Sequence, residues 1–426
     1  MVVPVWVGHL NPMTTLGRAL ERRGHDVAIL SFPEAAPRVA KAGLKHVVIG
    51  ADLLPAGEWE RRTRELSVRQ GLRAAHYTIR WLDTMVQSFL RDLPALLPEY
   101  DGLVMDQVAY GAETAAEATR TPLAIACNAL PVHFQPDVPV HSETWPYSTG
   151  RIALWRNRAV QELFLLLARS FLGRIRAARR SLNLSWNVRE FLNETPPSLA
   201  QVAQLPACLD FPRRHAPAHF HHTGPWHEPA AADPSGFDWS WLNGRPLIYA
   251  SLGTLQNGLD HLYQMILDAC AGLLVQVVLC LGREGGRRPA RVPSNATVLG
   301  YGPQLALLRK ASLVITHAGL NTTLESLAQG LPLVALPIAN EQPGIAARVR
   351  QAGVGDWLPI RGLGPEKLRQ AVLRIQGDSA FRQRAQACAR EMARSGGAAR
   401  AAEIIEEAVI QRKRVLRGRP ESAERR

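Results

Sequence analysis

Short apolar runs alternate with stretches of helical periodicity along most of the chain. The first apolar run covers residues 2–7, and residues 8–12 then form a turn in which Pro12 suits the first position of a helix. Gly24 is a residue type that ends helices, and a second apolar run follows at residues 27–30. A strand, a helix and a strand in this order predict a βαβ unit with a parallel sheet.

The alternation recurs in two series. In the first half of the chain, an apolar run at residues 102–105 ends in Asp106, and a helical stretch at residues 111–118 leads to a further run at residues 123–126. In the second half, five apolar runs are separated by helical stretches. They predict strands at residues 246–251, 275–281, 297–300, 313–316 and 333–336.

We therefore predict an α/β fold of two Rossmann-like, doubly wound domains that face each other across a cleft. The expected boundaries are residues 1–224 for the N-terminal domain and 245–410 for the C-terminal domain. Residues 225–244 are rich in Pro, Ala, Gly and Trp and predict a linker, and residues 411–426 predict a disordered basic tail. Residues 151–205 have long helical patterns, which we expect to decorate the N-terminal domain.

The composition excludes several classes of protein. No apolar run approaches the roughly 20 residues that a membrane-spanning helix needs, and the N-terminus lacks the pattern of a secretory signal, so we expect a cytoplasmic protein. The five cysteines include no C-x-x-C pair, which argues against zinc and disulfide frameworks. The histidines between residues 215 and 227 lack the spacing of a metal-ligand pair, and we expect no metal.

The net charge of +13 is concentrated in two places. Residues 151–180 carry eight Arg and one Glu, and residues 411–426 carry seven Lys or Arg and two Glu, which leaves about +1 for the rest of the chain. This distribution provides no general basic groove for a nucleic acid. Arginines mixed with leucines at residues 151–180 are typical of helices at an anionic membrane surface, such as the inner face of a membrane. The alternative interpretation is that the leucines pack on the N-terminal domain and the arginines are solvated.

Ligands of doubly wound sheets bind beyond the carboxyl ends of the strands, so the polar residues that follow strands are the candidate site. The loop after the strand at residues 313–316 has the character of a nucleotide site. Gly319 lets a ligand approach the backbone, while Asn321 and Thr322 are residue types that cap helices, whose N-termini attract anions. Glu325 lies one helical turn deeper, where a carboxylate can accept two hydrogen bonds from a ribose diol.

Two more polar pairs follow predicted strands. His9 and Asp106 each end a strand of the N-terminal domain, so we expect them to meet at one sheet edge, where the carboxylate would orient a general base. Glu341 and Gln342 follow the last predicted strand and suit the recognition of sugar hydroxyls.

Two other enzyme classes are excluded by motifs that the chain lacks. It has neither the G-x-S-x-G elbow of hydrolases around Ser251 nor the G-x-G-x-x-G of dehydrogenases after the first strand.

Residues 299–355 resemble the donor signature of the UDP-dependent glycosyltransferases of family 1. The matching motifs are Tyr301-Gly-Pro-Gln304, His317-Ala-Gly-Leu-Asn-Thr-Thr-Leu-Glu325, Gly330-Leu-Pro332 and Glu341-Gln342-Pro343. Gly8-His9-x-x-Pro12 is similar to the acceptor-side motif of the same family. The resemblance covers nearly the whole chain and implies a GT-B fold, a donor site in the C-terminal domain, an acceptor site in the N-terminal domain, and inversion of the anomeric centre without a metal.

The resemblance also implies the roles of the donor-side residues. Tyr301 takes the position where many members stack a Trp on the uracil, Gln304 would face the nucleoside, and Glu325 would hold the ribose. The residues that would contact the diphosphate are Ser251, Gly253, Thr254, His317, Asn321 and Thr322.

On the side of the transferred sugar, the resemblance implies that Glu341 and Gln342 hold the hexose, that His9 is the base and that Asp106 orients it. The sequence departs from the family at two of the matching positions. Ala318 stands where Gly or Cys is usual, and Glu341 stands where Asp is usual.

Within the family, the run from Gln342 to Val349 resembles that of bacterial members that glucosylate hydroxylated carotenoids such as zeaxanthin, although macrolide and sterol glycosyltransferases share much of it. We expect UDP-glucose or a related nucleotide sugar as donor substrate, no prosthetic group, and a small lipophilic hydroxylated acceptor. The alternatives are a soluble polyketide, sterol or flavonoid acceptor, a non-catalytic partner protein of the same fold, and a sugar-nucleotide epimerase of the same fold.

Overall fold

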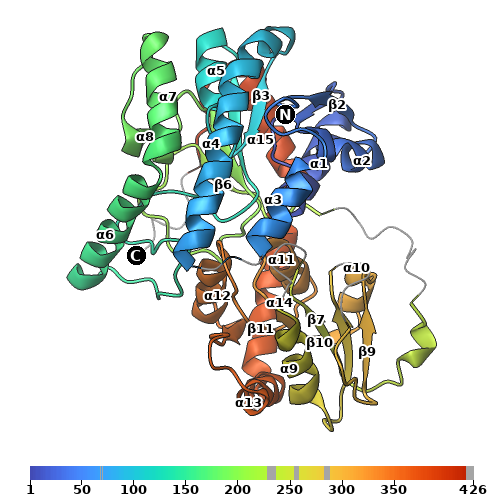
Figure 1. The fold of residues 1–426 in the computed structure, drawn as a ribbon. Coiled ribbons are helices and arrows are strands. Elements are labelled where there is room, and N and C mark those ends of the chain that lie inside the picture. The colour runs from blue at the N-terminus through green and yellow to red at the C-terminus, as the bar shows by residue number, and fades with distance from the viewer. Residues whose placement is uncertain (68, 70, 228–236, 254–258, 283–287, 419–426) are drawn as a thin grey trace.

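Two parallel β-sheets organise the chain, one in each of two domains that lie one above the other (Figure 1). The computed structural model describes residues 1–67, 69, 71–227, 237–253, 259–282 and 288–418. Among these residues, no helix is both long enough and apolar enough to cross a membrane. Three short 3₁₀ helices complete the connections, at Pro33–Ala35, Leu97–Glu99 and Trp239–Trp241.

The N-terminal sheet consists of two parallel segments that Val2 joins. One segment has the order β1-β2 and the other the order β3-β4-β5-β6, and Val2 forms parallel bridges to Leu30 on one side and to Met105 on the other. Every residue of β1, β3, β4 and β5 is buried, as expected for strands that are covered on both faces. The strands are β1 (Ala28–Ser31), β2 (Lys45–Val48), β3 (Leu103–Asp106), β4 (Leu123–Cys127), β5 (Ala200–Ala203) and β6 (Phe220–His222).

The first strand is shorter than predicted, and the first helix begins earlier. The predicted strand at residues 2–7 is reduced to the bridges of Val2, because Pro4 has no N–H to donate to a strand ladder. Helix α1 spans Val7–Glu21, so His9 lies in its first turn rather than in a preceding loop. Pro12 lies inside this helix and not at its first position.

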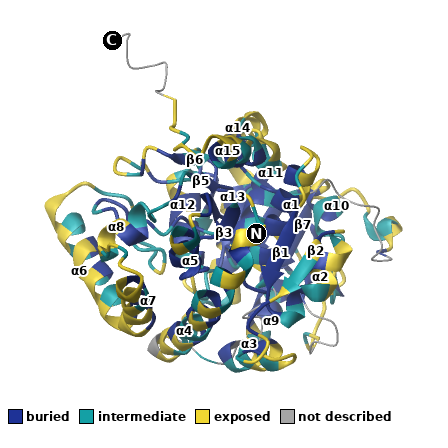
Figure 2. Cartoon of the chain, turned by 90° about the horizontal axis from the view of Figure 1, so that it is seen from above, coloured by how far each residue is buried: buried dark blue, intermediate teal, exposed yellow. Residues whose placement is uncertain are grey.

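Further helices lie around the N-terminal sheet and beside it (Figures 1 and 2). They are α2 (Ala36–Lys41), α3 (Glu58–Ser67), α4 (Gly71–Leu96), α5 (Ala112–Thr119), α6 (Arg151–Leu167), α7 (Arg169–Ser181) and α8 (Val188–Asn193). The helical pattern expected for residues 151–205 is correct for α6 to α8 but wrong for β5. This strand has the sequence Ala-Gln-Val-Ala, which has no strong strand propensity, and pairing with β4 and β6 decides its conformation.

The C-terminal sheet has six parallel strands in the order β12-β11-β10-β7-β8-β9. They are β7 (Leu247–Ser251), β8 (Gln276–Cys280), β9 (Ala296–Leu299), β10 (Ala311–Thr316), β11 (Leu333–Ala335) and β12 (Gly355–Trp357). The first five match the predicted strands within two residues at each end, whereas β12 was not predicted. The helices of this domain are α9 (Asp260–Cys270), α10 (Gln304–Leu308), α11 (Leu320–Ala328), α12 (Gln342–Gln351), α13 (Pro365–Gly377) and α14 (Ser379–Arg394).

The last helix, α15 (Gly397–Gln411), returns to the N-terminal domain (Figure 1). Its buried side chains belong to the N-terminal core, and they are Ala401, Ala402, Ile404, Ile405 and Ala408. The expected C-terminal boundary at residue 410 is therefore wrong, because the apolar face of α15 packs against α1, β4 and β5.

The tail after α15 also differs from the expectation. The backbone N–H groups of Val415 and Arg417 donate to the carbonyls of Leu199 and Ala218, over 3.0 and 2.8 Å. The first part of the tail is thus attached to the N-terminal domain, while residues 419–426 lie outside the described residues.

A buried triad of charged side chains joins the two domains. Asp210 Oδ2 accepts from Arg213 Nε at 2.5 Å, and Asp210 Oδ1 accepts from Arg348 Nε of α12 at 2.9 Å. All three side chains are buried, and the Arg348 guanidinium also lies 4.1 Å from the centre of the Phe211 ring. Burial acts to raise the pKa of Asp210, but the charges of the two arginines outweigh it and hold the pKa well below its usual range.

Near the triad, Cys208 forms a disulfide with Cys388 of α14. The sequence argument against disulfides is wrong for this pair, because the two cysteines are 180 residues apart and only the fold brings their Cα atoms to 5.7 Å. The remaining cysteines are free and buried.

We predict that Asp210→Asn lowers the free energy of unfolding by about 3–5 kcal/mol, because the substitution leaves two buried arginines without a counter-charge. Arg348→Met should cost less, since Asp210 then keeps Arg213. Urea unfolding monitored by tryptophan fluorescence measures both effects. Equal midpoints for Asp210→Asn and the wild type would contradict a stabilising role of the triad.

Candidate active site

The candidate site lies where the carboxyl ends of the two sheets face each other. Asn321, in the first turn of α11, contacts the N-terminal domain through both atoms of its amide. Its Nδ2 donates to the carbonyl of Gly8 at 3.2 Å, and its Oδ1 accepts from Gln204 Nε2 at 3.0 Å. The Gly8 carbonyl is available because Pro12, four residues later in α1, has no N–H to donate to it.

As the sequence predicted, the structure brings His9 and Asp106 together. His9 Nδ1 lies 2.8 Å from Asp106 Oδ2, and the carboxylate is fully buried at the end of β3. Two further donors fix this carboxylate, namely Asn128 Nδ2 on Oδ2 at 2.6 Å and the N–H of Val108 on Oδ1 at 2.9 Å. With Nδ1 hydrogen-bonded to a carboxylate, Nε2 is the nitrogen that can take a proton from a substrate hydroxyl.

The surrounding charges favour the protonated form of His9. Burial lowers the pKa of His9, but the charge of Asp106, its hydrogen bond and the charge of Glu341 outweigh burial, so the net effect raises the pKa. Glu341 precedes α12 in the C-terminal domain. Residues of both domains therefore set the basicity of this imidazole.

A cluster of three tryptophans reaches His9 through Trp6, and sequence reasoning missed it. The ring centre of Trp6 lies 5.6 Å from that of His9 and 5.4 Å from those of Trp59 and Trp81. Trp59, on α3, and Trp81, on α4, are buried, whereas Trp6 is half-buried. No motif links residues so far apart in the sequence, and only the packing of α3 and α4 brings Trp59 and Trp81 onto Trp6 beside His9.

The imidazole of His317 lies between two glycines. A Cβ atom built on Gly253 or on Gly319 would lie 2.5 Å from His317 Nε2, so neither position has room for a side chain. Gly253 also has a φ of +78°, a conformation that favours glycine. Burial lowers the pKa of His317 to about 4, against a hydrogen bond with the Ser251 backbone, so the ring is neutral near pH 7.

Helix α11 opens toward the His317 loop without a side-chain cap. Its N-cap is Gly319, and Asn321 and Thr322, which we expected to cap the helix, lie in its first turn instead. Uncapped N–H groups and the helix dipole favour an anion at this position. Ala318, which is buried directly before the N-cap, has a left-handed φ of +64°. This conformation is less favourable for alanine than for the glycine that is usual in this motif.

A hydrogen-bonded chain leads from the sheet core to Glu325. Tyr249 Oη donates to Gln304 Oε1 at 2.7 Å, and Gln304 Nε2 donates to the carboxylate of Glu325. Burial raises the pKa of Glu325 to about 7, against the hydrogen bond from Gln304, which acts to lower it. The structure therefore brings Gln304 and Glu325 together at the end of the sheet.

The other predicted donor residues are placed as follows. The Tyr301 side chain is 55% exposed beyond the end of β9, where a planar base can reach it. Gln342 Oε1 accepts from the N–H groups of Ile338 and Ala339, at 2.8 and 2.9 Å. Gln342 thus holds the loop before α12 through its side-chain oxygen. Thr254 lies outside the described residues.

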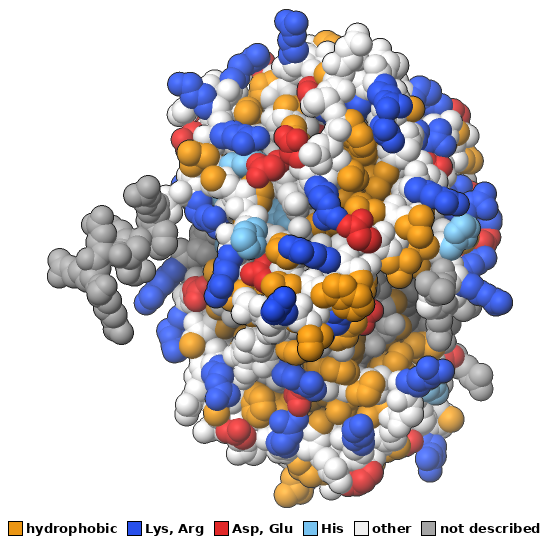
Figure 3. All heavy atoms as spheres, turned by 90° about the vertical axis from the view of Figure 1, so that its left-hand side faces the viewer, with side chains coloured by type: hydrophobic (Ala, Val, Ile, Leu, Met, Phe, Trp, Pro, Cys, Tyr) orange, Lys and Arg blue, Asp and Glu red, His pale blue; other side chains and the backbone are white. Residues whose placement is uncertain are grey.

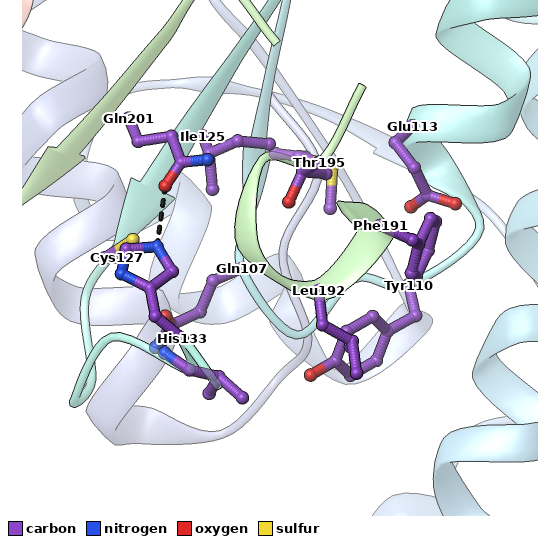
Figure 4. A pocket seen from close by; sticks show the side chains of 12 residues that line it. Gln107, Tyr110, Glu113, Ile125, Cys127, His133, Phe191, Leu192, Thr195 and Gln201 are labelled. Atoms are coloured by element: carbon purple, nitrogen blue, oxygen red, sulfur yellow. Dashed lines mark hydrogen bonds between the residues drawn. The ribbon is translucent and has the colours of Figure 1, made fainter. Parts of the chain in front are cut away.

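A small pocket in the N-terminal domain is separate from this site (Figure 4). Its lining comes from the ends of β3 to β5 and from α5 and α8, and includes Glu113, His133 and Gln201 but neither His9 nor Asp106. His133 Nε2 lies 2.8 Å from Gln201 Oε1. Burial lowers the pKa of His133 to about 3 and raises that of Glu113, which favours the neutral form of both groups.

Three of the histidines before the expected linker bond to protein groups. Ring nitrogens of His219, His221 and His222 lie 2.8 to 3.0 Å from oxygens of Ser198, Val415 and Leu205, respectively, and the last two histidines belong to β6. Within the described part of the chain, no three His, Cys, Asp or Glu side chains gather so that they could hold a metal ion.

Comparisons with known proteins agree with this architecture. Residues 264–408 match the family model of the erythromycin biosynthesis protein CIII-like C-terminal domain. The chain is 30% identical to a zeaxanthin glucosyltransferase of Pantoea ananas over 98% of its length and 97% of that protein. It is also 30% identical to a zeaxanthin glucosyltransferase of Pseudescherichia vulneris, over 96% and 97% of the two chains.

Among solved structures, the glycosyltransferase of kitacinnamycin superposes with a TM-score of 0.75 over 96% of this chain and 98% of that one, at 24% identity. This similarity shows the GT-B fold, in which two Rossmann-like domains face each other. Together with the full-length relatives, it shows that the chain belongs to family 1 of the glycosyltransferases, enzymes that transfer a sugar from a nucleotide sugar to an acceptor.

Proposed function

We propose that this glycosyltransferase transfers glucose from UDP-glucose to a hydroxyl of a lipophilic acceptor, and that the acceptor is a hydroxylated carotenoid such as zeaxanthin. The observation that carries the proposal is the 30% identity to two zeaxanthin glucosyltransferases over almost the whole chain, both domains included. The half-buried ring of Trp6 supports an apolar acceptor, because it offers apolar surface beside His9.

The reaction follows from the two halves of the site. His9 Nε2 takes the proton of the acceptor hydroxyl, and the Asp106 carboxylate stabilises the imidazolium that forms. The acceptor oxygen forms a bond to the anomeric carbon as the bond from that carbon to the UDP oxygen breaks. Attack opposite to the leaving group inverts the anomeric centre.

The leaving diphosphate gains its stabilisation from α11. The uncapped N-terminus of this helix and the neutral His317 provide hydrogen-bond donors and a positive dipole end, so we infer that the reaction needs no metal. Ser251, Gly253 and Thr254 complete the expected diphosphate contacts. On the nucleoside, Glu325 accepts from the ribose diol, and Gln304 and Tyr301 face the uracil ring. Glu341 and Gln342 hold the hexose.

The proposal predicts that the purified protein converts dispersed zeaxanthin and radiolabelled UDP-glucose to a labelled glucoside. A sterol, a flavonoid and a macrolide aglycone, dispersed in the same detergent, test the other acceptor classes.

His9→Ala should lower turnover by roughly 10²–10⁴-fold while UDP affinity stays the same, because an unassisted hydroxyl is a poor nucleophile at neutral pH. Asp106→Asn should slow transfer as well, because it removes the charge that stabilises the imidazolium.

Label in a flavonoid or macrolide but not in zeaxanthin would reject the carotenoid and keep the transfer reaction. If His9→Ala turns over at a rate close to that of the wild type, His9 is not the general base.

We also predict that Glu325→Ala and Gln342→Ala affect the donor differently. Glu325 would contact the ribose whichever sugar is attached, so its loss should weaken binding of UDP itself by about tenfold or more. Loss of Gln342 should weaken UDP-glucose and leave UDP unchanged. Calorimetry with both ligands measures the four affinities. An equal loss of UDP affinity in the two variants would show that the ribose and hexose assignments are wrong.

The pH dependence of UDP binding provides a separate prediction. Because burial raises the pKa of Glu325 from 4.5 to about 7, the carboxyl is protonated in part of the population at pH 6.5 and ionised at pH 8.5. Only the ionised form accepts two hydrogen bonds from the diol, so UDP affinity should rise over this range. In Glu325→Gln the rise should be smaller, because only the part that comes from titration of the UDP phosphate, which is equal in both proteins, remains. Parallel pH profiles would contradict the assignment.

The raised pKa also affects folding. An acid whose pKa is higher in the folded than in the unfolded protein stabilises the fold fully below the unfolded value, and this contribution is lost as the pH rises through about 7. In the complex with UDP, contacts between the ionised Glu325 and the ribose would offset this loss of folding stability.

A further inference from the structure

Helix α6 exposes large apolar side chains although its fully buried side chains are polar; Phe164 and Leu165 of the same helix are half-buried and pack on the N-terminal domain. The only buried residues of α6 are Asn157 and Gln161. Their side-chain amides donate to the carbonyls of Pro136 and Gln135, each over 3.0 Å. Large apolar side chains are exposed by 40 to 84%, and these are Ile152, Trp155, Leu163, Leu166 and Leu167.

The exposed apolar residues form one stripe along α6. With 3.6 residues per turn, Ile152, Trp155, Leu163 and Leu166 lie within about 80° of one another, and Asn157 and Gln161 lie on the opposite face. A soluble surface helix has the reverse distribution, with the apolar face toward the core. The hydrogen bonds of Asn157 and Gln161 fix the orientation of α6, so the stripe faces outward because of specific contacts.

Exposed arginines accompany the stripe on α6 and on the neighbouring α7. Arg174 and Arg179, by contrast, are held by Asp83 and Glu117, over 2.9 and 2.6 Å, and serve the fold. The exposed arginines that have no ion pair with any other described residue are Arg151, Arg158, Arg169, Arg176 and Arg180. Figure 3 shows this side of the molecule, where basic side chains are interspersed with apolar ones.

We propose that α6 docks on an anionic lipid surface, with the stripe in the headgroup boundary and the arginines on the lipid phosphates. The mixture of apolar and basic side chains is complementary to such a surface, since the apolar groups leave water and the cations meet negative charge. A second copy of the chain is a poor occupant of the same face. Two-fold packing would bring the excess of arginines on α6 and α7, +7 over residues 151–180, against the same excess in the partner.

The docking face is connected to the candidate active site by the segment of residues 128–150. Asn128 at its start donates to Asp106, and Gln135 and Pro136 accept from the buried face of α6. His141, farther along, accepts from the N–H of Gly344 in the C-terminal domain at 2.8 Å. A lipid surface under α6 would thus lie beside the segment that bridges the two domains. This link rests on the proposed function, in which a lipophilic acceptor passes from the bilayer to His9.

Flotation of the full chain with vesicles tests the proposal without any acceptor. We expect the protein to float with vesicles of phosphatidylglycerol and phosphatidylcholine, to float much less with phosphatidylcholine alone, and to be released as salt increases. Trp155→Glu/Leu166→Glu should lower vesicle binding by about tenfold or more. Arg151→Gln/Arg158→Gln should lower binding to anionic vesicles and leave the weak binding to neutral ones.

A matched control places the same two charges on the other domain. Leu274 and Leu373 are exposed by 79% and 49% in the C-terminal domain, and Leu274→Glu/Leu373→Glu should float like the wild type. Sedimentation velocity of the wild type and of Trp155→Glu/Leu166→Glu reports whether the stripe joins two copies. None of these residues belongs to the proposed catalytic or donor machinery, so transfer to a detergent-dispersed acceptor should be the same in all variants.

Three results would overturn the proposal. They are the absence of flotation with anionic vesicles, equal flotation of Trp155→Glu/Leu166→Glu and the wild type, and a wild-type dimer that this variant separates into monomers. Transfer to zeaxanthin is measured in detergent, so failure of the docking proposal and failure of the proposed acceptor give separate signatures.

Discussion

The buried contact of Asp210 with Arg348 ties the N-terminal domain to the C-terminal domain. Arg348 belongs to α12, and the same helix begins directly after Glu341, whose charge acts on His9. Gly344, in the first turn of α12, approaches His141 so closely that a Cβ atom would lie 2.7 Å from its carbonyl oxygen. A shift of α12 would therefore change the surroundings of His9, the loop that Gln342 holds and the bridging segment together. The geometry between the two halves of the candidate site depends on this fixed relation.

Much of the site could be predicted because its chemistry follows strand ends. Asp106 and the His317 loop each follow a short buried run, and parallel pairing brings such positions to one sheet edge whatever the loop lengths. The meeting of His9 with Asp106 followed from this rule, although His9 lies inside α1 rather than before it. The helix start was misplaced because proline suits a first turn, and here the carbonyl that Pro12 leaves free serves the contact with Asn321.

Features that depend on tertiary contacts between distant segments could not be predicted. Strand β5 has a weak local preference, α15 has an ordinary amphipathic pattern, and Cys208 and Cys388 have no sequence motif. The tryptophans near His9 come from three separate segments. The arginine-rich stretch was recognised from its charge, but only the fold separates Arg179, which is buried, from the arginines that remain exposed.

The return of α15 to the N-terminal domain constrains the order in which the chain can fold during synthesis. The C-terminal core is made of residues that precede α15, whereas the N-terminal core lacks one of its walls until Ala401, Ile405 and Ala408 have left the ribosome. The domain that is synthesised first is consequently completed last. Until then the surfaces of α1, β4 and β5 that α15 covers are apolar and open, so the nascent chain depends on α15 to close the domain that contains His9 and Asp106.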